Sequence, residues 1–224
     1  MNKIIQYLKK HILLSSILFV FILLISIVTA TYAYFSVNMS DNSTITGDAS
    51  STDLSLTVTR VIPTTANEDS LKMVPLLDNA LSNAINGVGG QKSCIDGNGN
   101  LSCKIYRIIV TNNSTNNVKV RGTVNLQSSG TSTFSNLSWT EITSPSQTKN
   151  GATINRVGES VLEESLLIQK NHSHTYYIAV WISENNNNQN TTDTGDFGGI
   201  VTFNAGGDNA GVTANFGGYE AVKN

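Results

Sequence analysis

The sequence predicts an all-β protein whose exported part is an antiparallel β-sandwich with one short helix. Three observations indicate this class: apolar residues alternate with polar ones over several segments, amide and hydroxyl side chains take the place of charged ones, and an uncharged apolar run precedes them. With 224 residues, the chain is long enough for one ordinary domain and an appendage. The formal net charge is −2 and no basic cluster follows the first ten residues, which argues against a nucleic-acid partner.

Residues 1–33 are predicted to be a signal peptide or a membrane anchor. Lys3, Lys9 and Lys10 precede an uncharged apolar run from Ile12 to Ala30, which would form a hydrophobic helix. At about 1.5 Å per residue the run spans roughly 28 Å, close to the hydrocarbon thickness of a bilayer. The positive-inside bias keeps the lysines in the cytoplasm, so the rest of the chain is expected to be exported.

The end of the run also matches a signal peptidase site. Thr31 and Ala33 fit the small-x-small pattern, which places cleavage between Ala33 and Tyr34. Cleavage would remove three of the 14 Lys and Arg residues and none of the 16 Asp and Glu residues, leaving a net charge of −5. We favour cleavage over retention, and either fate leads to an extracellular or cell-surface location.

The exported part is expected to contain three regions. Residues 34–52 are predicted to be a flexible spacer, because 36–52 contain no apolar cluster. Residues 53–205 form the predicted sandwich domain, and residues 206–224 are predicted to be a Gly-rich flexible tail.

Alternating apolar residues mark the strands of the predicted domain. The clearest segments are 54–58, 106–110, 118–126, 176–182 and 197–203. Each has one apolar and one polar face, which is typical of antiparallel sheets with one solvated side. A jelly-roll or immunoglobulin-like sandwich would accommodate them.

A short helix is predicted over residues 76–86. Leu77, Leu81 and Ile85 lie four apart, and Gly87 follows as a stop signal. We expect this helix to cover an open end of the sandwich.

Two further segments are ambiguous. Val161 to Ile168 is compatible with a helix or a strand, and the polar segment from Gln127 to Gly158 leaves its strands and the strand order undetermined. The Asn-rich residues 184–196 are predicted to be a mobile loop.

Cys94 and Cys103 are predicted to form a disulfide. They bracket a turn-forming Asp-Gly-Asn-Gly-Asn sequence, so they are expected to be cross-strand neighbours, and export favours their oxidation. The spacing does not fit a CxxC redox pair, and two cysteines without a nearby histidine are too few for a metal site.

Two weak metal-binding patterns remain. Asp96, Asn98 and Asn100 match the first positions of a calcium loop, but the later Gly and Glu are missing, so a turn is favoured. His172 and His174 lie two apart before a strand and could share a metal, although solvated loop histidines are the more common case. We expect no cofactor.

Trp181 is the aromatic residue that departs from the apolar alternation of its predicted strand. It lies out of phase with the core positions of segment 176–182, so it could line a ligand-binding face, or it could belong to a second core on the opposite face of the sheet. No GxSxG, HExxH or paired-carboxylate motif accompanies it. The chain is therefore predicted not to be an enzyme.

Short motifs along most of the chain resemble the TasA/camelysin family of exported Gram-positive proteins, whose signal peptides are cut by a SipW-type peptidase. The residues concerned are Thr31-Tyr32-Ala33, TDLSLTV at 52–58, IYRIIVTNNS after Cys103, and TYYIAVWIS. The resemblance implies a jelly-roll-like surface protein that assembles into biofilm matrix fibres by donating an N-terminal strand, which here would come from residues 34–52. The disulfide hairpin and the Gly-rich tail depart from the family pattern.

The expected function is a non-enzymatic structural subunit of the cell surface or biofilm matrix, capable of self-assembly. The alternative is an adhesin-like binding module that the uncleaved helix holds at the membrane. A metal-dependent hydrolase acting through His172 and His174 is a third and weaker hypothesis.

The cleavage site gives a direct test of these alternatives. We expect protein recovered from the medium to begin at Tyr34, as measured by intact mass and N-terminal sequencing. Protein that begins at Met1 and remains in the membrane fraction would instead identify a permanent anchor.

Overall fold

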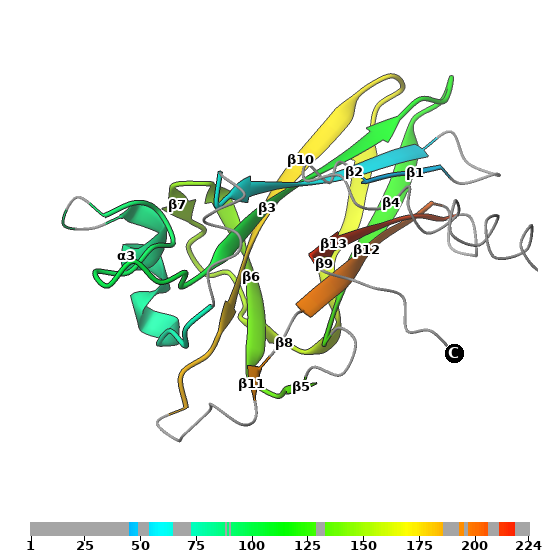
Figure 1. Cartoon of the computed structure of the whole chain (residues 1–224). Helices are drawn as coiled ribbons and strands as arrows, with labels where there is room; N and C mark the ends of the chain where they lie inside the picture. Colours follow the sequence, from blue (N-terminus) through cyan, green and yellow to red (C-terminus); the bar gives the residue numbers. More distant parts are fainter. Residues whose placement is uncertain are drawn as a thin grey trace, which may run out of the picture. The chain divides into compact units, whose positions relative to one another are not determined.

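The computed structural model describes most of the chain beyond residue 44 (Figure 1). The described residues are 45–48, 54–64, 73–87, 89, 91–128, 133–185, 193–194, 197–205 and 211–217. The chain divides into two units, Met1–Asp41 and Asn42–Asn224, and all described residues belong to the second. The predicted hydrophobic helix and the cleavage site between Ala33 and Tyr34 lie outside the described residues. Within the described ranges, no helix has the length and apolar character needed to cross a membrane.

Two antiparallel sheets pack face to face and form the predicted β-sandwich (Figure 1). The first sheet has the order β1-β2-β3-β10-β6-β7, with β8 also paired to β6. Its strands are β1 (Ile45–Asp48), β2 (Leu54–Ile62), β3 (Lys104–Asn112), β10 (Ser173–Ile182), β6 (Leu137–Ser144), β7 (Gln147–Thr148) and β8 (Asn155–Arg156). The second sheet has the order β13 (Gly211–Gly217), β12 (Phe197–Ala205), β4 (Val118–Ser128) and β9 (Gly158–Ile168). The short strands β5 (Thr133–Phe134) and β11 (Asp193–Thr194) pair with each other.

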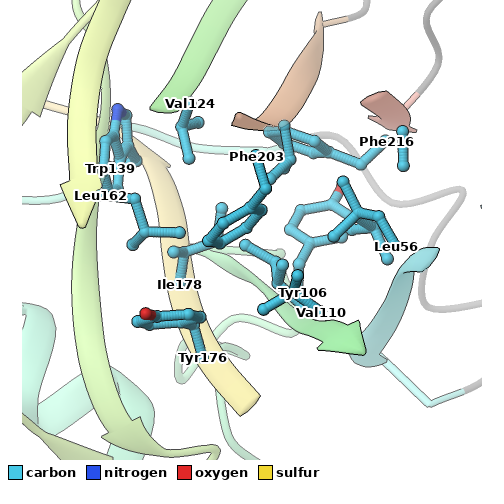
Figure 2. Packing of buried hydrophobic residues seen from close by; sticks show 14 of the residues in the cluster. Leu56, Tyr106, Val110, Val124, Trp139, Leu162, Tyr176, Ile178, Phe203 and Phe216 are labelled. Atoms are coloured by element: carbon cyan, nitrogen blue, oxygen red, sulfur yellow. The ribbon is translucent and has the colours of Figure 1, made fainter. Parts of the chain in front are cut away.

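The main hydrophobic core fills the space between the two sheets, and the predicted alternation is confirmed. Inward-facing residues of both sheets converge in this core, as Figure 2 shows. Tyr106 of β3 packs against Phe216 of β13 with ring centroids 4.7 Å apart, and Tyr176 of β10 stacks on Phe203 of β12 at 5.7 Å. Aromatic pairs at such separations add attraction beyond the area that they bury.

A second, smaller core lies on the outer face of the first sheet. Here α3 (Leu81–Asn86), preceded by the 3-10 turn η1 (Asp78–Ala80), covers one end of that face. Leu81 and Ile85 are its buried residues, and they pack with the disulfide and Trp181. The predicted cover is therefore present.

The helix is shorter than the predicted segment 76–86. The Leu76 backbone N–H donates to the Ile182 carbonyl at 2.8 Å, so Leu76 is held extended beside β10 before η1 begins. Leu77, expected on the buried face, is 46% exposed. Gly87 ends the helix as predicted, with φ of 64° in the left-handed region that glycine adopts readily.

Two segments predicted to be flexible contain strands. Within the predicted tail, β13 pairs with β12 over seven residues, and it buries Val212, Ala214 and Phe216 in the main core. The prediction of a flexible tail is wrong there because three apolar residues alternate with polar ones between the two glycines of the strand. In the predicted spacer, β1 pairs with β2 from Ile45↔Val58 to Asp48↔Ser55.

The ambiguous segments are also resolved as strands. Val161 to Ile168 belongs to β9, which pairs with β4. The polar segment from Gln127 to Gly158 supplies β6, which pairs with β10 and places Trp139 in the main core. Of the predicted loop 184–196, only residues 184–185 and 193–194 are described.

Because β13 contributes to the main core, substitution of its buried residues should lower the free energy of unfolding. We expect Phe216→Ala to lower the free energy of unfolding by about 3–5 kcal/mol, the usual cost of truncating a buried aromatic ring. The matched control is Thr213→Ala, an exposed position of the same strand, for which we expect a change within about 0.5 kcal/mol. Urea denaturation measures both, and equal effects would show that β13 is not part of the core.

Candidate functional site

The predicted disulfide between Cys94 and Cys103 is present, with the two Cα atoms 4.8 Å apart. Both cysteines are fully buried beneath α3, together with Leu101 and Ile105. The disulfide therefore anchors the loop that supports the cover on the outer face.

The loop between the cysteines is a turn stabilised by Asp96. The Asp96 Oδ1 atom accepts hydrogen bonds from the backbone N–H groups of Asn98 at 2.9 Å and Asn100 at 2.8 Å, and Oδ2 accepts from the Asn100 side chain at 3.1 Å. The bonds from Asn100 are the main cause that lowers the pKa of Asp96 below its ordinary value. The carboxylate is engaged by the turn itself, which favours the turn interpretation over the calcium loop.

Trp181 is completely buried, so the hypothesis that it lines an exposed ligand face is wrong. Its out-of-phase position places the indole ring in the second core, beneath α3. The indole Nε1–H donates a hydrogen bond to Asp78 Oδ1 at 3.0 Å. A buried indole needs such a partner for its N–H group.

Asp78 lies at the centre of a polar network that we name the Asp78 cluster, made up of Asp78, Ser138, Arg156, Trp181 and Ser183. Besides the indole, Asp78 Oδ1 accepts from the Ser183 hydroxyl, and Oδ2 accepts from Arg156 Nη2 at 3.0 Å. Arg156 Nη1 also donates to the hydroxyls of Ser138 and Ser183, which lie 2.9 Å from each other. The cluster thereby links η1, β6, β8 and the end of β10.

The electrostatics of the cluster favour the ionised carboxylate. Partial burial raises the pKa of Asp78, but the hydrogen bonds from Ser183 and Trp181 and the positive charge of Arg156 outweigh it. The net result is a pKa below the ordinary value of an aspartate.

The arrangement of the Asp78 cluster suits a structural role rather than a catalytic one. The Ser138 and Ser183 hydroxyls contact a guanidinium and a carboxylate, and the cluster contains no histidine that could accept a serine proton. The hydrogen bonds of Asp78 instead join η1, at the start of the cover, to the sheet that it covers.

The two candidate metal ligands lie at the other end of β10. His172 and His174 are both exposed; Nδ1 of His172 lies 2.8 Å from the Lys170 carbonyl, and the His174 ring lies 4.6 Å from the Tyr176 ring. Within the described residues, no group of three His, Cys, Asp or Glu side chains is positioned to hold a metal ion. The pair alone provides an incomplete ligand set.

Glu163 and Glu164 of β9 take part in different interactions. The Tyr176 hydroxyl donates to Glu163 Oε2 at 3.1 Å, whereas Glu164 forms an exposed ion pair with Arg121. Burial and the negative charge of Glu163 raise the pKa of Tyr176. These carboxylates are not arranged as a catalytic pair.

Sequence analysis did not identify the Asp78 cluster. Asp78 and Arg156 are 78 positions apart, and neither belongs to a recognisable motif. The one available signal was the phase of Trp181, which left a second core on the outer face as one of two possibilities; an indole buried there would need a hydrogen-bond acceptor.

The fold and the cluster together define an antiparallel β-sandwich with a disulfide-supported cover on one outer face. No protein-family model and no curated protein matches the chain. One similar solved structure is a family 123 glycoside hydrolase from Clostridium perfringens, studied for glycolipid glycan hydrolysis, with a TM-score of 0.31 and 15% identity. The match covers 51% of this chain and 20% of that protein, so the chain spans about a fifth of its length.

The charge of Asp78 should stabilise the fold in a pH-dependent way. We expect Asp78→Asn to lower the free energy of unfolding by about 1–2 kcal/mol at pH 7, because the acceptor for Trp181 survives and the ionic partner of Arg156 is lost. Since the folded pKa lies below the unfolded value of about 3.9, this stabilisation is present above pH 4 and disappears as the pH falls through the folded pKa.

Chemical denaturation at pH 7 and pH 2.5 measures this difference. The exposed carboxylate of Glu159 provides the control variant Glu159→Gln, which should change stability little at neutral pH. An Asp78→Asn effect that is equally large at both pH values would contradict the electrostatic role.

Proposed function

We propose that this chain is an exported, non-enzymatic structural subunit of the cell surface or biofilm matrix. The sequence supports this through the apolar run and the peptidase site that precede the domain. The Cys94–Cys103 disulfide supports it as well, because such bonds persist in oxidising compartments.

The observation that carries the proposal is the position of β1. This strand comes from the segment that directly follows the predicted export signal, and it forms the outermost strand of the first sheet among the described residues. It pairs with β2 through only four residues. An edge strand that is paired over so short a length can be replaced by the equivalent strand of another molecule.

The edge of the second sheet at β9 is less suited to pairing. The register between β4 and β9 shifts on both sides of Gly122, and β9 carries Glu159, Glu163 and Glu164. Bulges and charges are the usual means by which edge strands avoid pairing with other chains. Assembly by strand exchange is therefore better supported at β1 than at β9, and β1 comes from the segment that the family resemblance gives as the donor strand.

The alternative of a membrane-tethered adhesin is less well supported, because its candidate ligand-binding residue is not accessible. Trp181 was its candidate ligand contact, and the indole is buried and bonded to Asp78. The structural subunit is accordingly the better supported function.

Strand exchange can be detected by a disulfide between cysteines introduced at paired positions of β1 and β2. Thr46 and Thr57 are direct partners in the register, so Thr46→Cys combined with Thr57→Cys should form a disulfide wherever the two strands pair. If β1 is donated between molecules, oxidised assemblies will give a ladder of covalent multimers on non-reducing gels.

The matched control places cysteines at Thr202 and Thr213, which are direct partners in β12 and β13. This pair is expected to give only monomers with an internal crosslink. Monomers alone from the Thr46 and Thr57 pair, under conditions where filaments are visible by negative-stain microscopy, would rule out exchange of β1.

A further inference from the structure

Part of the outer face of the first sheet lies beyond the buried residues of the second core, and Tyr177, at the boundary, packs against that core. In two adjacent cross-strand rows, Thr57–Ile109–Thr175 and Thr59–Arg107–Tyr177, three strands contribute directly opposed residues. All six side chains lie on the face opposite the main core, and each is at least partly exposed. We name this set the Arg107 face.

Arg107 is the arginine whose guanidinium has no partner in the described part of the chain. The three other arginines are engaged: Arg60 Nε donates to the Pro63 carbonyl, Arg121 pairs with Glu164, and Arg156 pairs with Asp78. Arg107 Nε is buried without a hydrogen-bond acceptor. The residue as a whole is partly exposed. A guanidinium without a partner on an inner strand of a sheet requires an explanation, and a ligand that binds the accessible part of the side chain is one.

The hydroxyls around Arg107 are also available. No hydrogen bond within the described residues involves the side chains of Thr57, Thr59, Thr175 or Tyr177. One row further along the same strands, the hydroxyls satisfy one another, because Thr111 Oγ1 lies 2.8 Å from Ser173 Oγ. Within the described residues, the polar side chains of the two rows around Arg107 therefore lack the mutual hydrogen bond that the Thr111 row has.

The chemistry of the Arg107 face matches a carboxylate-bearing sugar chain. A guanidinium presents a planar fork that binds a carboxylate through two parallel hydrogen bonds. The surrounding threonine and tyrosine hydroxyls both donate and accept, as sugar hydroxyls require. The Tyr177 ring and Ile109 provide apolar surface for the C–H face of a sugar ring. The face carries one positive charge and no acidic residue in either row, so its local charge complements an acidic ligand.

We propose that the Arg107 face binds an acidic polysaccharide, with Arg107 holding a uronate carboxylate and the flanking hydroxyls holding the sugar hydroxyls. The flat face leaves an extended chain free to continue over β2, β3 and β10. This inference is independent of strand exchange, because it involves the outer face of the sheet rather than its edge.

Affinity electrophoresis of the full-length protein in mild detergent tests this inference. Native gels containing polygalacturonate or alginate should retard the wild-type protein, whereas gels containing neutral dextran should not. Retardation should weaken as salt is added, because the contact with Arg107 is ionic. Equal retardation by dextran, or none by either acidic polymer, would overturn the proposal.

Substitutions in the Arg107 face test whether polysaccharide binding occurs there. Arg107→Ala is expected to weaken retardation at least tenfold, and Arg107→Lys several-fold, because lysine keeps the charge without the fork. Tyr177→Phe retains the packing against the second core and removes only the hydroxyl, so a partial loss is expected. Arg121→Ala is the matched control, since Arg121 is an exposed arginine on the second sheet. Wild-type retardation of Arg107→Ala, with its melting temperature unchanged, would refute the assignment.

Discussion

Strand β10 is buried on both of its faces over its second half, and both hydrophobic clusters depend on it. Tyr176, Ile178 and Val180 point into the main core, whereas Ala179 and Trp181 point into the second core. A strand that is buried on both sides cannot shift its register without exposing one set of residues and inserting the wrong set into the other core. This constraint fixes β3 and β6 on either side of β10, and with them the position of the Asp78 cluster.

The same constraint divides the outer face of the first sheet into two halves of different character. Where β10 ends, Trp181 requires an apolar cover, and η1, α3 and the disulfide loop supply it while Asp78 accepts the indole N–H. Where β10 begins, its outward residues are threonine and tyrosine, and Arg107 lies between them and β2. The first half is therefore covered and joined to the sheet by hydrogen bonds, whereas the second half carries the proposed ligand-binding residues around Arg107. The β1 edge is a separate surface, so the proposed assembly and the proposed glycan binding need not compete.

The sequence predicted most of the fold because the alternation of apolar residues is local and repeats in each strand. It also located the disulfide, since a tight turn brings Cys94 and Cys103 together irrespective of the remainder of the chain. It failed at β13, where the high glycine content concealed Val212, Ala214 and Phe216. Glycine is required within this strand: Gly217 has a φ of 71°, and a Cβ atom there would lie 2.6 Å from the Phe197 carbonyl oxygen. Composition alone therefore indicated flexibility where the glycine serves close packing.

The sequence by itself determined the fold class, the disulfide and the existence of a short helical cover, because periodicity and turn chemistry act between residues that are close along the chain. Only the tertiary structure decided the Asp78 cluster, the burial of Trp181 and the isolation of Arg107. Each of these depends on partners contributed by other strands, and local sequence contains no record of which strands become neighbours. Global packing sets the ion pair between η1 and β8 and the pairing of β3 with β2 and β10. It satisfies the carboxylate of Asp78 and leaves Arg107 Nε without an acceptor among the described residues.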